Sequence, residues 1–98
     1  MNSIEIRKIT GNDAAALQGQ FKESAAFFLE PQLCDVEDFS GDIIKLWIIL
    51  KKEEFLITFN ENSRFYGLAF KNIFNQLVYL GDYKSLSDAY YNLVNRNE

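Results

Sequence analysis

The sequence predicts a single α+β domain in which a four-stranded antiparallel meander is packed by two helices. Three observations support this prediction. The chain has 98 residues, a length that suits one hydrophobic core, so residues 1–98 are expected to form one domain. Its second half contains four β-rich runs with short polar breaks, and an amphipathic segment follows them. The predicted order of elements is β-α-β-β-β-β-α.

The first half of the chain is expected to form a strand, a helix and a loop. Residues 3–9 alternate apolar and charged side chains, which is typical of a strand with one buried face. Residues 10–13 offer a turn and a helix N-cap, and the helix is expected to end before Pro31. Its apolar stripe comprises Ala14, Leu17, Phe21, Ala25 and Phe28. Residues 30–42 carry acids without a lysine or arginine and are expected to form a loop.

The second half of the chain carries the strands of the predicted meander. The β-rich runs are residues 43–50, 55–59, 64–70 and 76–80. Their connections are too short for parallel crossovers, which need about a dozen residues, so neighbouring strands should be antiparallel. A second helix should follow, with Ser85 as its N-cap. Its buried face is expected to comprise Leu86, Ala89, Tyr90, Leu93 and Val94.

Both faces of the predicted sheet are apolar. In the first run of the meander, Ile44, Leu46 and Ile48 alternate with Ile43, Trp47 and Ile49. A sheet that faces water on one side would alternate apolar and polar residues instead. Two helices can cover one face, and the other needs the acidic loop, a second copy of the chain or another protein. A homodimer formed through the sheet or its edge is therefore one expected assembly.

The charge of the chain limits its partners. There are 10 basic and 14 acidic residues, which give a net charge of -4. Nucleic acid and anionic membranes are therefore not expected partners, and the longest apolar run, residues 43–50, is too short to span a bilayer. Cys34 is the only cysteine, and the chain begins without the pattern of a secretory leader. A cytoplasmic location is expected.

The sequence contains no recognisable catalytic or cofactor motif. Histidine is absent, so Ser-His and Cys-His pairs are missing, and an enzyme is less expected than a binding protein. The acids of residues 35–42 do not form a calcium loop, because Trp47 occupies the position where the final acid should follow Gly41. The glycines form no nucleotide-binding loop. No metal or cofactor is predicted.

The remaining hypothesis is a small acidic protein-interaction or regulatory module. It would bind a protein partner through an apolar sheet face and the acidic loop. The residues expected to contact the partner are Asp35, Glu37, Asp38, Asp42, Trp47, Phe65 and Tyr66. For Trp47 and Tyr66, a structural role in the core is the alternative. The alternative function is a small-ligand-binding protein or a cofactor-independent enzyme with a helix-sheet pocket, whose polar groups would be Tyr66, Tyr79, Arg64 or Asp82.

Overall fold

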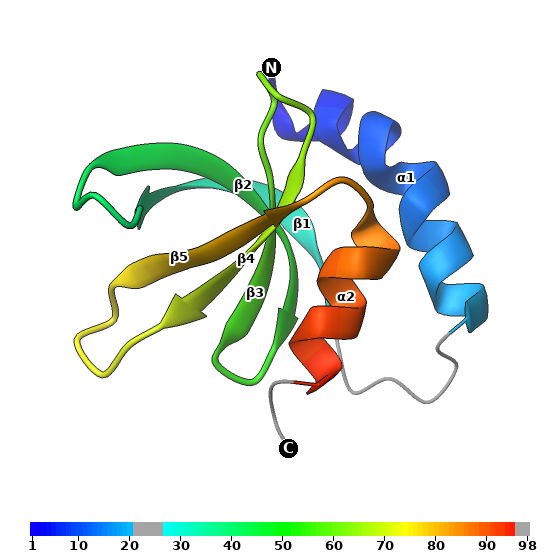
Figure 1. Ribbon diagram of the computed structural model, residues 1–98. Helices are drawn as coiled ribbons and strands as arrows, with labels where there is room; N and C mark the ends of the chain where they lie inside the picture. Colours follow the sequence, from blue (N-terminus) through cyan, green and yellow to red (C-terminus); the bar gives the residue numbers. More distant parts are fainter. Residues whose placement is uncertain (21–26, 96–98) are drawn as a thin grey trace.

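The computed structural model describes residues 1–20 and 27–95, and over these residues it contains two helices and a five-stranded sheet (Figure 1). The elements are α1 (Ser3–Gln20), β1 (Phe27–Glu37), β2 (Ile43–Lys52), β3 (Phe55–Phe59), β4 (Tyr66–Lys71), β5 (Leu77–Tyr83) and α2 (Leu86–Asn95). The predicted α+β class and the antiparallel order from β2 to β5 are confirmed. The first half of the chain differs from the prediction.

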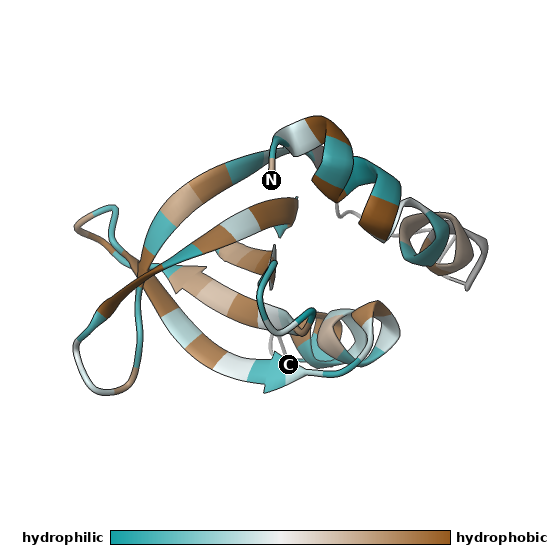
Figure 2. Cartoon of the chain, turned by 90° about the horizontal axis from the view of Figure 1, so that it is seen from above, coloured by the Kyte–Doolittle hydropathy of each residue, from teal (hydrophilic) through white to brown (hydrophobic). Residues whose placement is uncertain are grey.

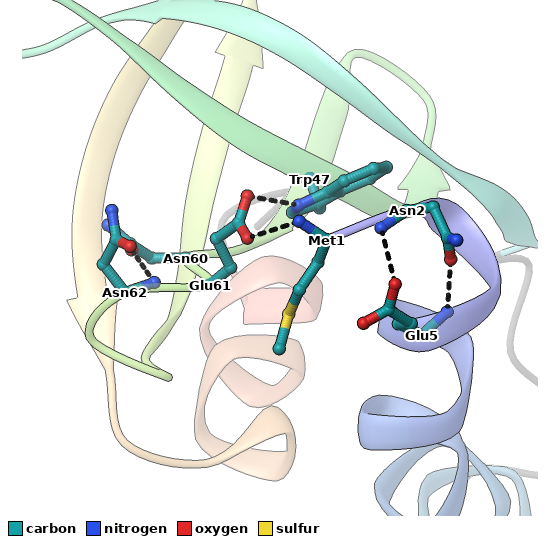
Figure 3. Close-up of polar contacts among 7 residues, drawn as sticks. All are labelled: Met1, Asn2, Glu5, Trp47, Asn60, Glu61 and Asn62. Carbon is teal, nitrogen blue, oxygen red and sulfur yellow. Dashed lines mark hydrogen bonds and ion pairs between the residues drawn. The ribbon is translucent and has the colours of Figure 1, made fainter.

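The predicted strand at residues 3–9 is wrong, because these residues form the start of α1. Asn2 caps the helix: the backbone N–H of Glu5 donates to Asn2 Oδ1 at 2.9 Å. The backbone N–H of Asn2 donates in return to Glu5 Oε1 at 3.4 Å (Figure 3). This reciprocal pair is a capping box, which satisfies two backbone groups that a helix start leaves unpaired. The predicted N-cap at residues 10–13 therefore lies inside the helix.

The buried face of α1 explains why residues 3–9 form a helix instead of the predicted strand. Ile6, Thr10 and Leu17 are buried, and their spacings of four and seven place them on one helical face. Ile4, which strand alternation would bury together with Ile6, is exposed. The hydroxyl of Thr10 donates to the carbonyl of Ile6 at 2.9 Å, so this polar side chain is satisfied within the helix. The alternating pattern was therefore compatible with both elements.

The predicted helix is confirmed at residues 14–20, which lie in α1, but 27–37 form strand β1. The predicted loop at residues 30–42 is therefore wrong up to Glu37, and only residues 38–42 form a turn. β1 pairs antiparallel with β2, with Leu33 opposite Trp47. The register shifts between Phe28 and Gln32, on either side of the proline. A bulge of this kind accommodates a residue without a backbone N–H. Two members of the predicted helical stripe, at positions 21 and 25, lie outside the described residues.

The five strands close into a small barrel in the order β1-β2-β3-β4-β5. Closure comes from a parallel pairing of the first strand with the last, at Glu37 and Val78. The β1–β2 and β4–β5 turns project at the end of the molecule opposite the two helices (Figure 1). Among the described helices, none is long and apolar enough to cross a bilayer.

Two apolar clusters occupy opposite faces of the strands. The helix-covered core comprises Ile6, Leu17, Trp47, Ile49, Leu50, Ile57, Phe59, Tyr66, Leu68, Leu86, Ala89, Tyr90 and Leu93. The strand core comprises Val36, Leu46, Ile48, Leu56, Ala69 and Tyr79. Its members come from all five strands and from neither helix, so the curved sheet covers this face itself (Figure 2). The cover that the sequence required for a second face is therefore supplied by the closed sheet, and the apolar faces give no argument for a second copy of the chain.

Candidate functional site

The predicted aromatic contacts lie mainly in the interior. Trp47 is only 6% exposed, and its indole N–H donates to Glu61 Oε1 at 3.3 Å (Figure 3). Tyr66 is buried in the same helix-covered core, and its hydroxyl donates to Asp13 Oδ2 of α1 at 2.7 Å. Phe65, in contrast, is exposed beside the start of β4. Trp47 and Tyr66 therefore stabilise the packing of the helices on the sheet and present little surface to a partner.

Glu61, in the turn between β3 and β4, lies over Trp47. Its carboxylate also pairs with the ammonium group of Met1, at 3.1 Å. The hydrogen bonds from this ammonium and from the Trp47 indole hold the pKa of Glu61 below its ordinary value. The contact ties the turn to the start of α1 (Figure 3).

The four predicted acidic residues gather at the end of the β1–β2 hairpin. Asp35 lies in β1 and pairs with Lys45 Nζ at 3.0 Å, and both side chains are exposed. Glu37 is the last residue of β1, while Asp38 and Asp42 lie in the turn that follows. The segment predicted as a loop is therefore a strand and a tight turn, with its carboxylates collected at one end of the barrel.

Asp38 organises this turn. Its Oδ1 accepts hydrogen bonds from the backbone N–H of Ser40 at 2.9 Å, the hydroxyl of Ser40 at 2.7 Å and the backbone N–H of Asp42 at 3.0 Å. Gly41 has a positive φ of 89°, which a side chain would strain. The backbone N–H of Asp38 also donates to the carbonyl of Asp42 at 2.9 Å, and the carbonyl of Asp38 accepts from the backbone N–H of Gly41 at 3.1 Å. The turn is therefore closed by hydrogen bonds from both the Asp38 side chain and the backbone.

The pKa of Asp38 gives a test of this turn. The hydrogen bond from the Ser40 hydroxyl, followed by those from backbone N–H groups, lowers the pKa of Asp38 below its ordinary value of 3.8. A lowered folded-state pKa means that the carboxylate stabilises the turn above about pH 4, and that this contribution is lost as the pH falls through the folded-state pKa. Carbon-detected NMR titration should give a midpoint for Asp38 below 3.8, and Ser40→Ala should move it upward. An unshifted midpoint in the natural chain would contradict the hydrogen-bonded turn.

Two turns carry exposed apolar residues that the sequence did not indicate as contact residues. Phe39 is 78% exposed at the tip of the β1–β2 turn, and Ile43 is exposed where β2 begins. In the β4–β5 turn, which the sequence presented as a polar break, Ile73 is 91% exposed and Phe74 is 75% exposed. Single exposed apolar residues are common, but turns normally select glycine, proline, asparagine, aspartate and serine. We call these two turns, residues 38–42 and 72–75, the hairpin end.

The β4–β5 turn is fixed in the same manner as the β1–β2 turn. Asn72 Oδ1 accepts hydrogen bonds from the backbone N–H of Phe74 at 2.9 Å and of Gln76 at 3.0 Å. Asn75 has a positive φ of 61°, a conformation that asparagine tolerates better than most residues. The apolar side chains of this turn are therefore held out into the solvent by an ordered backbone.

A cavity of about 400 Å³ lies beside the β1–β2 turn. Its lining comprises Asp38, Phe39, Ser40, Ile44, Leu46, Asn60, Tyr79, Gly81 and Asp82. The cavity opens where the pairing of β1 with β5 stops, because the chain turns away directly after Glu37. Of the four polar groups that the alternative hypothesis named, Tyr79 and Asp82 line this cavity, whereas Tyr66 and Arg64 do not. The cavity is formed by strands and turns, however, and no described helix lines it.

Tyr79, in the lining of the cavity, and Cys34, elsewhere in the sheet, both favour their protonated forms. The hydroxyl of Tyr79 donates to Asp82 Oδ1, and burial together with this hydrogen bond raises the pKa of Tyr79, so the phenol stays protonated at neutral pH. Burial, with a further contribution from Asp35, also raises the pKa of Cys34, which disfavours the thiolate. No cluster of three or more His, Cys, Asp or Glu that could hold a metal ion occurs among the residues that the structure describes.

Comparisons of the chain with family models, with curated proteins and with solved structures found no match. Function is therefore inferred from the geometry of the hairpin end and of the cavity beside it.

Proposed function

We propose that the chain is a small protein-interaction module that binds a basic protein partner through the hairpin end. The observation that carries the proposal is the exposure of Phe39 at the tip of a hydrogen-bonded turn. Aromatic residues are enriched at protein interfaces and among the residues that contribute most to binding. The sheet faces, which the sequence favoured as the binding surface, are covered within the chain, so the proposed surface is the hairpin end.

The charges around Phe39 indicate the sign of the partner. Asp38 and Asp42 flank the tip, and Glu37 precedes it. The nearest cation in the hairpin, Lys45, is paired with Asp35. A partner with a basic surface would be steered toward this end, and these rim carboxylates would act mainly on the association rate.

The hydrogen bonds within the two turns favour binding at low entropic cost. A loop that becomes immobilised only on binding weakens the interaction, because each side chain that is ordered costs roughly 0.5 to 1.5 kcal/mol of binding free energy. Here the hydrogen bonds of Asp38 and Asn72 fix both turns before any partner arrives. The apolar side chains of Phe39 and Phe74 are thus presented in a preorganised form.

Photo-crosslinking in the native cell tests this proposal. A photoreactive phenylalanine analogue at position 39 should give a discrete adduct, and the same analogue at Tyr91 serves as the matched control. Tyr91 is also an exposed aromatic residue, at 62%, but it lies on α2, away from the hairpin end (Figure 1). Mass spectrometry then identifies the adduct, and a product of twice the chain mass would indicate a homodimer.

Alanine at position 39 provides the quantitative prediction. Phe39→Ala should weaken binding of the crosslinked partner by tenfold or more, as expected for truncation of an interface anchor. Because Phe39 is exposed, the Phe39→Ala chain should unfold in urea at a midpoint near that of the natural chain. Tyr91→Ala should change neither the affinity for the partner nor this midpoint. Equal adduct yields from positions 39 and 91, or unchanged affinity of Phe39→Ala, would refute the proposal.

The cavity beside the turn favours a second candidate function, a small-ligand-binding protein. Its volume of about 400 Å³ lies at the lower end of the range for ligand pockets. Tyr79 and Asp82 would supply the polar groups of such a pocket. For both candidate functions, the next point to establish is which chemical group enters the cavity.

A further inference from the structure

The lining of the cavity beside the β1–β2 turn includes two carboxylates and the apolar side chains of β2. Asp38 belongs to the turn and Asp82 to β5, so the two acids come from different elements of the lining. Leu46, which is almost fully buried, and Ile44 contribute apolar surface from β2. Lysine and arginine are absent from the described residues that line it. The lining of the cavity therefore combines negative charge with apolar side chains.

The Asp82 carboxylate is held in place from inside the barrel. Tyr79, whose ring is buried in the strand core, donates its hydroxyl to Asp82 Oδ1. Asp82 itself is exposed, so its carboxylate can accept further hydrogen bonds from a group in the cavity. Asn60 and Ser40 add polar atoms to the same lining. The acceptors are thus positioned before a ligand enters.

We propose that this cavity binds an arginine side chain. A guanidinium group carries five N–H donors in a planar fork, which can engage two carboxylates from separate elements better than the point charge of a lysine ammonium can. The aliphatic stem would lie on Ile44 and Leu46, and the guanidinium plane can stack on the ring of Phe39 at the rim. That a partner protein supplies this arginine rests on the proposed function.

A titration with capped amino acids tests the cavity alone. The probe is N-acetyl-arginine N-methylamide, with the citrulline analogue as a neutral isostere and the lysine analogue as a cation of different shape. In amide NMR spectra of the labelled chain, the arginine probe should give saturable shifts at Leu46, Asn60 and Gly81, which line the cavity. The citrulline and lysine analogues should bind roughly tenfold or more weakly, the loss expected from missing charge-assisted hydrogen bonds.

Asp82→Asn identifies the carboxylate that is responsible. The asparagine carbonyl can still accept the hydrogen bond of Tyr79, so the fold is retained while one negative charge is removed. This variant should bind the arginine probe roughly tenfold more weakly. Asp88→Asn changes the net charge equally on α2 and should bind the probe like the natural chain.

Several results would overturn the assignment. Equal binding of the citrulline or lysine analogue, an unchanged affinity of Asp82→Asn, or shifts on α2 instead of around the cavity would each do so. Because the probe needs no partner, the result is independent of crosslinking at position 39. A failed titration with an intact crosslink would refute the arginine pocket alone, and a lost crosslink with an intact titration would refute only the protein-interaction function.

Discussion

Replacing Trp47 with alanine should lower the free energy of unfolding by about 3 to 5 kcal/mol, the range for truncation of large buried aromatic residues. The side chain lies in the helix-covered core, together with residues of both helices and of β2, β3 and β4. Its loss leaves a cavity where α1 meets the sheet, and it removes the donor to Glu61. Urea unfolding followed by circular dichroism at equilibrium measures the change.

Two further variants separate the contributions at this position. Trp47→Phe keeps an aromatic ring in the core but removes the indole N–H, so it should cost less than Trp47→Ala. Glu61→Gln keeps an acceptor for the indole and removes the charge that pairs with the Met1 ammonium, so its effect should be small at this exposed site. A Trp47→Ala chain with the stability of the natural chain would contradict the placement of this residue in the core.

The second half of the fold could be predicted because chain length and local chemistry restrict it strongly. Connections of a few residues between apolar runs leave only antiparallel hairpins, whatever the rest of the molecule does. The start of α2 is likewise local: the backbone N–H of Asp88 donates to Ser85 Oγ at 3.1 Å, as the predicted cap requires. Ala89, Tyr90 and Leu93 are buried on the predicted face.

The first half could not be predicted from pattern alone. The sequence of residues 3–10 is compatible with two elements. A strand would place Ile4 and Ile6 on one face, and a helix would place Ile6 and Thr10 on one face. The capping box of Asn2 and Glu5 was the local sign that favoured the helix. Strand β1 pairs with β2 across the turn at residues 38–42, and this pairing outweighs the helical spacing that the sequence showed up to position 28.

The candidate site could likewise be predicted only in part. The acidic residues at 35, 37, 38 and 42 were visible as charge in the sequence, and the structure gathers them at one hairpin end. Phe39 and Phe74 were missed because an aromatic residue in the sequence is more often buried than exposed. The cavity depends on where the pairing of β1 with β5 stops, and strand register of this kind is invisible in a sequence.

Gly67→Ala should destabilise the chain by about 1 to 3 kcal/mol, the usual cost of overpacking a core. Gly67 lies in β4 opposite Thr58 of β3. A Cβ atom at this position would overlap the hydroxyl of Tyr79 and would lie 2.6 Å from Thr58 Oγ1. The methyl group would therefore displace the Tyr79 ring and break its hydrogen bond to Asp82. Glycine in this strand marks the close approach of another side chain.

Gly11→Ala provides the matched control for this substitution. A Cβ at Gly11 meets no heavy atom within 4 Å, and the residue lies within α1, where alanine is favoured over glycine by up to about 1 kcal/mol. The same chemical change should therefore stabilise the chain at position 11 and destabilise it at position 67, as measured by urea unfolding. In a Tyr79→Phe background, Gly67→Ala should cost less, because the overlapping hydroxyl is gone. An unchanged cost would show that the crowding comes from the ring and from Thr58, and that the room left by Gly67 does not serve the Tyr79 hydroxyl.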